Sequence, residues 1–187
     1  MKSLILASGS PRRKELLKKF GFTYSIIKSS YEEKDVLSSP EETAMARAEG
    51  KAKDVFLKLT DKENSIVLGA DTIVVLDGEI IGKPKNKNEA RETLLRLSDK
   101  EHVVITAYSI IMSDKIITDF VSSYVLFNNL EESLITEYVE TELPLDKAGS
   151  YGIQDGYNLV DTIRGSINNV IGLPIELFEK ELRALLK

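Results

Sequence analysis

Residues suited by type and spacing to phosphate chemistry gather near the start of the chain. An apolar run, residues 4–7, leads into Ser8-Gly9-Ser10-Pro11-Arg12-Arg13, and apolar residues at helical spacing follow. The pattern predicts a strand, a small-residue loop and a helix that has Ser10 at its N-cap and proline at its first position. Arg12 and Arg13 then occupy the first helical turn, where unpaired N–H groups and the helix dipole favour acidic residues. Hydroxyls, free N–H groups and two guanidiniums suit a phosphate chain, although an exposed basic turn is the simpler alternative.

A second helix start in the same chain has the ordinary charge pattern. There Ser39 and Pro40 are followed by Glu41 and Glu42, and Glu42 stands three residues after the cap, as in a capping box. Cations at an exposed helix start cost only about 0.3–1 kcal/mol each, so the inverted pattern at the first helix does not by itself require a function.

Two carboxylates are candidates for acid–base or metal chemistry. Asp71 lies between the apolar runs 66–68 and 73–75, where an unpaired carboxylate would be costly. It is either a structural residue bonded to backbone N–H groups or a metal ligand or general base. Glu33 follows an expected strand and could supply a second carboxylate, but an acidic loop is usually only solvated.

Two lysines and one glutamine complete the set of candidates. Lys83 stands in Gly-Lys-Pro, where the proline disfavours helix and the glycine leaves room for a ligand, although a surface lysine in a turn is equally compatible. Lys51 borders the apolar face of an expected helix, where a lysine ordinarily snorkels to the surface. Gln154, in the small-residue segment 146–156, offers a donor and an acceptor suited to a base edge, but tight packing explains that segment equally well.

Several common chemistries lack material. His102 is the only histidine and there is no cysteine, so a Ser-His-Asp triad, thiolate catalysis and histidine- or cysteine-rich metal sites are disfavoured. We therefore interpret His102 as structural. The chain also has no P-loop ending in Gly-Lys-Ser/Thr and no dinucleotide-binding fingerprint.

The elements that must position these residues alternate between strands and helices. Asp77-Gly78 between apolar runs predicts a hairpin. The mixture of hairpins and crossovers predicts an α/β fold with a mixed sheet. Strands are expected at 4–7, 23–28, 65–70, 72–76, 79–81, 102–112, 116–127, 158–163 and 169–171, and helices at 11–20, 40–59, 88–97, 131–141 and from Pro174 onward.

Composition restricts the class of protein. The 187 residues fit one domain, residues 1–187, and no apolar run approaches the roughly 20 residues of a membrane span. We expect no secretory signal, no membrane partner and a cytoplasmic location. The net charge of -5 provides no broad basic surface, so we expect no nucleic-acid partner and only local phosphate binding, as for a nucleotide.

Five segments together resemble the Maf family in order and spacing over nearly the whole chain. They read Leu-Ala-Ser-Gly-Ser-Pro-Arg-Arg-Lys-Glu-Leu-Leu at 6–17, Gly-Ala-Asp-Thr-Ile-Val at 69–74, Gly-Lys-Pro at 82–84, Asp-Lys-Ala-Gly-Ser-Tyr-Gly-Ile-Gln at 146–154 and Gly-Leu-Pro at 172–174. In combination these motifs are far more specific than any one of them. One departure is Asp155, which stands where glycine often follows Ile-Gln in the family.

The resemblance implies a nucleoside triphosphate pyrophosphatase that cleaves between the α- and β-phosphates with Mg²⁺ or Mn²⁺. Thr72 after Asp71 and Gln154 after Ile153 resemble the branch that acts on dTTP and UTP. The implied fold is an elongated two-lobed α/β structure with a cleft, similar to inosine triphosphate pyrophosphatases, and a homodimer is implied as well. The implied roles are Asp71 as proton acceptor or metal-linked base, Glu33 as a metal ligand, Thr72 and Gln154 in base selection, and Ser8, Arg12, Arg13, Lys51 and Lys83 in binding the substrate.

Two questions stay open at this level. The family is associated with inhibition of septum formation, so the chain could instead be a nucleotide-binding regulator of cell division whose hydrolysis is incidental. Modified pyrimidine nucleotides could also be the substrates in place of ordinary dTTP and UTP.

Overall fold

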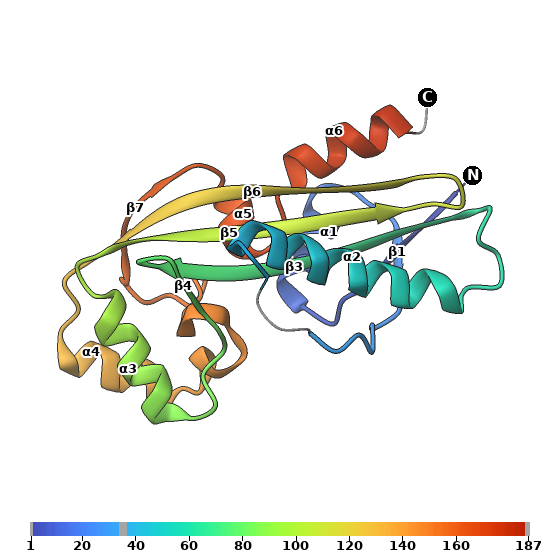
Figure 1. The fold of residues 1–187 in the computed structure, drawn as a ribbon. Coiled ribbons are helices and arrows are strands. Elements are labelled where there is room, and N and C mark those ends of the chain that lie inside the picture. Colours follow the sequence, from blue (N-terminus) through green and yellow to red (C-terminus); the bar gives the residue numbers. More distant parts are fainter. Residues whose placement is uncertain (1, 34–36, 186–187) are drawn as a thin grey trace. The chain divides into compact units, whose positions relative to one another are not determined.

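A computed structural model describes residues 2–33 and 37–185, and its strands form one mixed sheet (Figure 1). The strand order is β2-β1-β3-β5-β6-β7, and β4 pairs with β3. β1 is parallel to both β2 and β3, whereas the β3–β4 and β6–β7 pairs are antiparallel. The expected α/β class with a mixed sheet flanked by helices is confirmed. The strands are β1 (Ser3–Leu6), β2 (Tyr24–Ile26), β3 (Ser65–Leu76), β4 (Glu79–Ile81), β5 (Glu101–Ile111), β6 (Ile116–Phe127) and β7 (Val160–Arg164).

The helices follow the same alternation along the chain. They are α1 (Pro11–Lys19), α2 (Pro40–Lys58), α3 (Lys87–Leu97), α4 (Glu132–Glu140), α5 (Ile167–Ile171) and α6 (Ile175–Leu185), with short 3-10 turns at η1 (Leu143–Asp146) and η2 (Ala148–Ser150). None of the helices within residues 2–33 and 37–185 is both long enough and apolar enough to cross a membrane.

The chain divides into two compact units, and the first contains both helix starts discussed above. It comprises the described residues up to Asp71, Thr106–Val121 and the described residues from Gly172 onward. Its core includes Ala52 and Val55 of α2 packed with apolar residues of β1, β3 and β5. The expectation that 1–187 form one domain stays a prediction.

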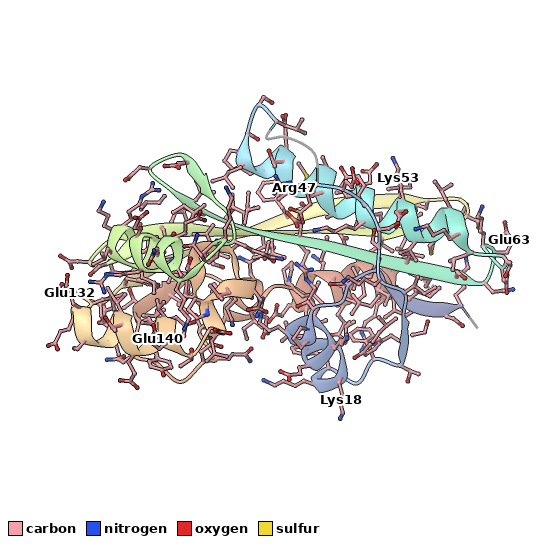
Figure 2. The ribbon with its side chains drawn as sticks, turned by 90° about the horizontal axis from the view of Figure 1, so that it is seen from below. Lys18, Arg47, Lys53, Glu63, Glu132 and Glu140 are labelled. Carbon is pink, nitrogen blue, oxygen red and sulfur yellow. The ribbon has the colours of Figure 1, made fainter. Side chains whose placement is uncertain are left out.

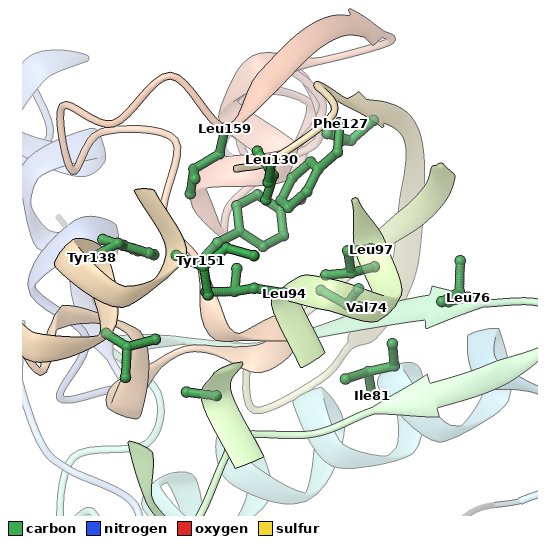
Figure 3. Close-up of a cluster of buried hydrophobic side chains, with 14 of the residues drawn as sticks. Val74, Leu76, Ile81, Leu94, Leu97, Phe127, Leu130, Tyr138, Tyr151 and Leu159 are labelled. Carbon is green, nitrogen blue, oxygen red and sulfur yellow. The ribbon is translucent and has the colours of Figure 1, made fainter. Parts of the chain in front are cut away.

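The second unit comprises Thr72–Ile105 and Ser122–Ile171 and has its own apolar core (Figure 3). Apolar side chains of α3 and of the ends of β3 and β6 pack there with Tyr138 and Tyr151. His102 lies in this core, with its Nε2 2.7 Å from the Tyr151 hydroxyl and its ring edge-on to Phe127. His102 is therefore a core residue, and its burial lowers its pKa to about 4.

The helix ends and turns agree closely with the expectations. Ser10 precedes α1 with extended backbone, and Gly21 follows it with φ 77°. The Ser39 side chain accepts a hydrogen bond from Glu42 N at 3.1 Å, as its N-cap role requires. Asp77 and its glycine neighbour both have positive φ in the predicted hairpin between β3 and β4.

Two expectations about the elements were wrong. Residues 65–70 and 72–76 are not separate strands, since β3 continues without a break through Asp71. Residues 169–171, expected as a strand, belong to α5. Ser166 Oγ accepts from Asn169 N at 3.1 Å, which is the hydrogen bond of a helix N-cap, and a short apolar run does not distinguish helix from strand.

Candidate active site

Asp71 stands in the middle of a buried strand, and its partner is a lysine. The residue is 5% exposed, and its Oδ1 accepts a hydrogen bond from Lys51 Nζ at 2.5 Å. Its Oδ2 is buried and has no hydrogen-bond partner among the described residues. The alternative in which backbone N–H groups satisfy this carboxylate is therefore not what the structure shows. One oxygen is held in an ion pair and the other is left to accept a hydrogen bond.

A glycine explains why Lys51 reaches Asp71. A Cβ at Gly69 would overlap Ala48 O and lie 2.8 Å from Ala52 N, so α2 packs directly on the backbone of β3. This close approach places Lys51, the neighbour of Ala52, at the buried carboxylate, and leaves its side chain only 16% exposed. Lys51 is therefore a largely buried partner of Asp71 and not a snorkelling surface lysine.

Glu33 and Arg47 extend this charged group. Lys51 Nζ donates a second hydrogen bond to Glu33 Oε1 at 2.9 Å, and Arg47 Nη1 lies 3.5 Å from Glu33 Oε2. Arg47 projects from α2 (Figure 2) one helical turn before Lys51. Sequence reasoning did not select Arg47, although its spacing of four residues from Lys51 was a signal that could have found it.

The start of α1 contributes a half-buried arginine to the same unit. Arg13 Nε donates to Gly172 O at 2.8 Å, and its Nη1 donates to Ser8 Oγ at 3.1 Å. Burial lowers the pKa of Arg13, whereas its attraction to Asp71 and Glu33 opposes that shift. The guanidinium is thus fixed in place and electrostatically coupled to both carboxylates.

The unusual charge of the first α1 turn is confirmed. This turn contains no acidic residue, and the Ser10 side chain makes no capping hydrogen bond. The Ser10 N–H instead donates to Ser8 Oγ at 3.2 Å. Arg12, which is half-buried, carries a second positive charge beside Arg13. This helix start therefore keeps the features that favour an anion.

The second unit holds the other sequence-predicted residues. Lys83 and Gln154 are exposed, and Thr72, which follows Asp71 along β3, is half-buried. The backbone N–H of Gly149 donates to Gly82 O at 3.1 Å, which joins the turn that carries Lys83 to the segment that leads to Gln154.

A buried polar network supports the residues around Gln154. Asp155 Oδ2 accepts from the Tyr138 hydroxyl at 2.5 Å and lies 3.2 Å from Lys147 Nζ. The Tyr138 hydroxyl also accepts from Gly152 N at 3.0 Å. Burial and the Asp155 carboxylate both raise the pKa of Tyr138. Sequence reasoning missed Tyr138 and Lys147, because their pairing with Asp155 depends on long-range packing.

The first unit offers oxygen ligands for a divalent cation. The carboxylates of Asp71 and Glu33 both contact Lys51 Nζ, so the two acids lie close enough to share one positively charged group, the Lys51 ammonium. Oδ2 of Asp71, which has no hydrogen-bond partner within residues 2–33 and 37–185, can coordinate a cation as well. The described residues contain no group of three or more histidine, aspartate or glutamate side chains that could hold a metal ion. Two carboxylates are ligands that a divalent cation can use when water and phosphate oxygens complete its coordination.

Comparison with known proteins gives consistent full-length matches in sequence. A dTTP/UTP pyrophosphatase of Clostridium botulinum (strain Kyoto / Type A2) is 45% identical over 183 residues, which cover 94% of this chain and 93% of the relative. One from Bacillus anthracis is 47% identical over 185 residues, covering 98% and 95%.

The likeness to solved structures is weaker. A nucleoside-triphosphatase / dITP/XTP pyrophosphatase from Mycobacterium abscessus ATCC 19977 / DSM 44196 gives a TM-score of 0.46 at 15% identity, covering 100% of this chain and 97% of the other. A HAM1 protein from Coxiella burnetii gives the same TM-score and identity over 70% and 75%. We draw no conclusion from similarity at this level. Residues 3–185, by contrast, match the family described as Maf-like protein, and this chain belongs to that family.

Proposed function

We propose that this protein hydrolyses dTTP and UTP between the α- and β-phosphates and releases the nucleoside monophosphate and pyrophosphate. The observation that carries the proposal is the buried Asp71, which has one oxygen held by Lys51 and the other without a hydrogen-bond partner in the described part of the chain. The relatives named dTTP/UTP pyrophosphatase, 45% and 47% identical over nearly the full chain, support this proposal.

The cations of the first unit would bind the triphosphate. A nucleoside triphosphate carries about four negative charges, and fixed cations stabilise the charge that moves to the pyrophosphate leaving group in the transition state. Arg13 is suited to this role because Ser8 and Gly172 already fix its guanidinium. Lys51 and Arg12 would add charge from the same unit, and we assign Lys83 to the phosphates as well.

Asp71 would act as the general base. Its Oδ2 can accept a hydrogen bond from the attacking water while Oδ1 stays with Lys51, so the carboxylate is held in one orientation during proton transfer. A positioned base of this kind contributes about 10²–10⁴-fold to a rate.

A divalent cation, Mg²⁺ or Mn²⁺, would be held by Asp71 and Glu33 together with phosphate oxygens. When bound, it would neutralise phosphate charge and lower the pKa of a coordinated water. Lys51 Nζ has three N–H groups and donates two of them to Glu33 and Asp71, so the third can donate to a phosphate oxygen while the contact with Asp71 stays in place.

Base selection and assembly complete the proposal. We assign Thr72 and Gln154 to recognition of the pyrimidine, since an amide supplies both a donor and an acceptor for a base edge. We also propose one domain, a homodimer, a cytoplasmic location, and no nucleic-acid or membrane partner.

The test is product analysis. The purified protein is incubated with a panel of nucleoside triphosphates and Mg²⁺ or Mn²⁺, and pyrophosphate is separated from orthophosphate. Pyrophosphate together with UMP or dTMP is the expected result. Orthophosphate as the product would refute the cleavage position. Absence of turnover in protein that binds UTP would favour the nucleotide-binding regulator.

A further inference from the structure

Asp54, on α2, binds the segment that leads to Glu33. Its Oδ2 accepts hydrogen bonds from Ser30 N at 2.7 Å and from Ser29 Oγ at 2.9 Å, and Lys58 Nζ lies 2.7 Å from its Oδ1. Lys58 also donates to Ser30 Oγ at 2.7 Å. The contact with Lys58 and the bond from Ser30 N lower the pKa of Asp54 to about 2, so this acceptor stays ionised at neutral pH.

An aromatic contact fastens the same segment to the same helix. A Cβ at Gly50 would overlap the ring of Tyr31, so that ring lies directly on the α2 backbone at a position where only glycine leaves room. Tyr31 N also donates to Ser29 Oγ at 3.0 Å. Gly50 and Asp54 are four residues apart and therefore share one side of the helix.

The Glu33 side chain lies in a partly exposed position. It is 46% exposed and forms ion pairs with Lys51 and Arg47. Exposed ion pairs contribute little to holding two flexible side chains in one geometry. The bonds to Asp54 and the Tyr31 ring, by contrast, fix the backbone two to four residues before Glu33.

We propose that Asp54 is a positioning residue, which together with the Tyr31–Gly50 contact keeps the Glu33 carboxylate beside Lys51 and Asp71. The inference rests on the proposed function in one respect, namely that Glu33 and Asp71 hold the divalent cation. Asp54 does not touch that cation, since its carboxylate is committed to Ser29, Ser30 and Lys58.

The test compares two carboxylates of α2. Asp54 and Glu49 each form a salt bridge to a lysine four residues later, and Glu49 also accepts from Thr118 Oγ1 at 3.1 Å, but only Asp54 bonds to residues 29 and 30. Asp54→Asn replaces one acceptor oxygen by a donor and removes the charge, and Glu49→Gln is the matched control. Gly50→Ala displaces Tyr31 independently, while alanine is the better helix former.

Two readouts separate positioning from general stability. The first is binding of Mn²⁺ to the protein, without and with UTP, measured as the decrease of the free Mn²⁺ signal in electron paramagnetic resonance. The second is UTP turnover across a series of Mn²⁺ concentrations. We expect Asp54→Asn and Gly50→Ala to weaken Mn²⁺ binding about 10-fold, as loss of a residue that orients a ligand does, with kcat at saturating Mn²⁺ within about 3-fold. Glu49→Gln should stay within about 2-fold in both.

Each outcome bears on the proposal. Mn²⁺ affinity unchanged in folded Asp54→Asn and Gly50→Ala proteins would overturn it, and so would an equal loss in Glu49→Gln. Wild-type protein that binds no Mn²⁺ with or without UTP would overturn it as well. Wild-type protein that binds Mn²⁺ but does not hydrolyse UTP would refute the proposed function, while the binding comparison would still decide the role of Asp54.

Discussion

Replacing Asp71 by asparagine tests the proposed base at almost constant size. The variant keeps an oxygen that can accept from Lys51 Nζ, now 2.5 Å away, but it removes the charge and the capacity to take a proton. We expect the fold to persist and turnover of UTP to fall at least 100-fold, because general-base catalysis contributes about 10²–10⁴-fold. A 100-fold loss corresponds to about 2.7 kcal/mol of transition-state stabilisation.

Asp71→Asn should lower the free energy of unfolding by less than the loss of a buried ion pair that has no other partner. Breaking a buried salt bridge costs about 3–5 kcal/mol when the remaining charge is left alone. Lys51 keeps Glu33 at 2.9 Å and is 16% exposed, so we expect a loss of about 1–2 kcal/mol in the free energy of unfolding.

The assay combines urea denaturation, steady-state hydrolysis of UTP and equilibrium binding of UTP. Without a divalent cation, affinity for UTP should be unchanged or higher in Asp71→Asn, since the substitution removes a negative charge that repels phosphates. A folded variant that retains turnover within about 3-fold of wild type would refute the assignment of Asp71. A loss confined to UTP binding would show that Asp71 organises the substrate and does not take the proton.

Three further predictions concern the packing around the site. Burial lowers the pKa of His102 from its ordinary 6.5 to about 4, so the unfolded chain takes up the proton first, and the free energy of unfolding should fall by about 3 kcal/mol from pH 6.5 to pH 4. Urea denaturation of His102→Gln should lack this fall, and an equal fall in both proteins would contradict the prediction. Asp155→Asn removes the negative charge that Tyr138 and Lys147 contact beside the proposed base-binding glutamine, so KM for UTP should rise about 10-fold with kcat within about 3-fold. A fall in kcat alone would contradict this prediction. Gly69→Ala places a Cβ against the backbone of α2 and should lower the free energy of unfolding by about 1–3 kcal/mol, measured by thermal or urea denaturation. Unchanged stability would show that the helix can move away freely.

Much of the fold was predictable because its signals are local. The cap at Ser39, the hairpin at Asp77-Gly78 and the bounds of α2 depend on residues that are neighbours in sequence. The error at Asn169 has the same origin, since a short apolar run fits either element and the choice depended on a buried side chain that donates to Val104 O and Ser123 Oγ.

The candidate site was predictable in its residues but not in its contacts. Burial of Asp71 was evident from the apolar runs on both sides, and the cost of burial required a partner. The partner depends on how closely α2 approaches β3, which is set by Gly69, a residue whose packing no local pattern reveals. Arg47 and Asp54 were missed for a related reason, because their partners lie in the segment 29–33.

A comparison of two lysine–carboxylate groups indicates which one is built for chemistry. Lys147 Nζ contacts Leu143 O, Asp146 Oδ1 and Asp155 Oδ2, which engages all three of its N–H donors, and Asp155 Oδ2 also accepts from Tyr138. Lys51 contacts two carboxylates, and Asp71 keeps a buried oxygen without a partner among the described residues. Both groups bury a charge pair of similar exposure, so burial alone does not distinguish them. The fold itself satisfies the hydrogen bonds of the network around Asp155. The buried Oδ2 of Asp71 instead carries the free-energy cost of an unmade hydrogen bond, which a bound water, a metal or a proton on a phosphate would remove. We therefore place the reaction at Asp71 and a supporting role at Asp155.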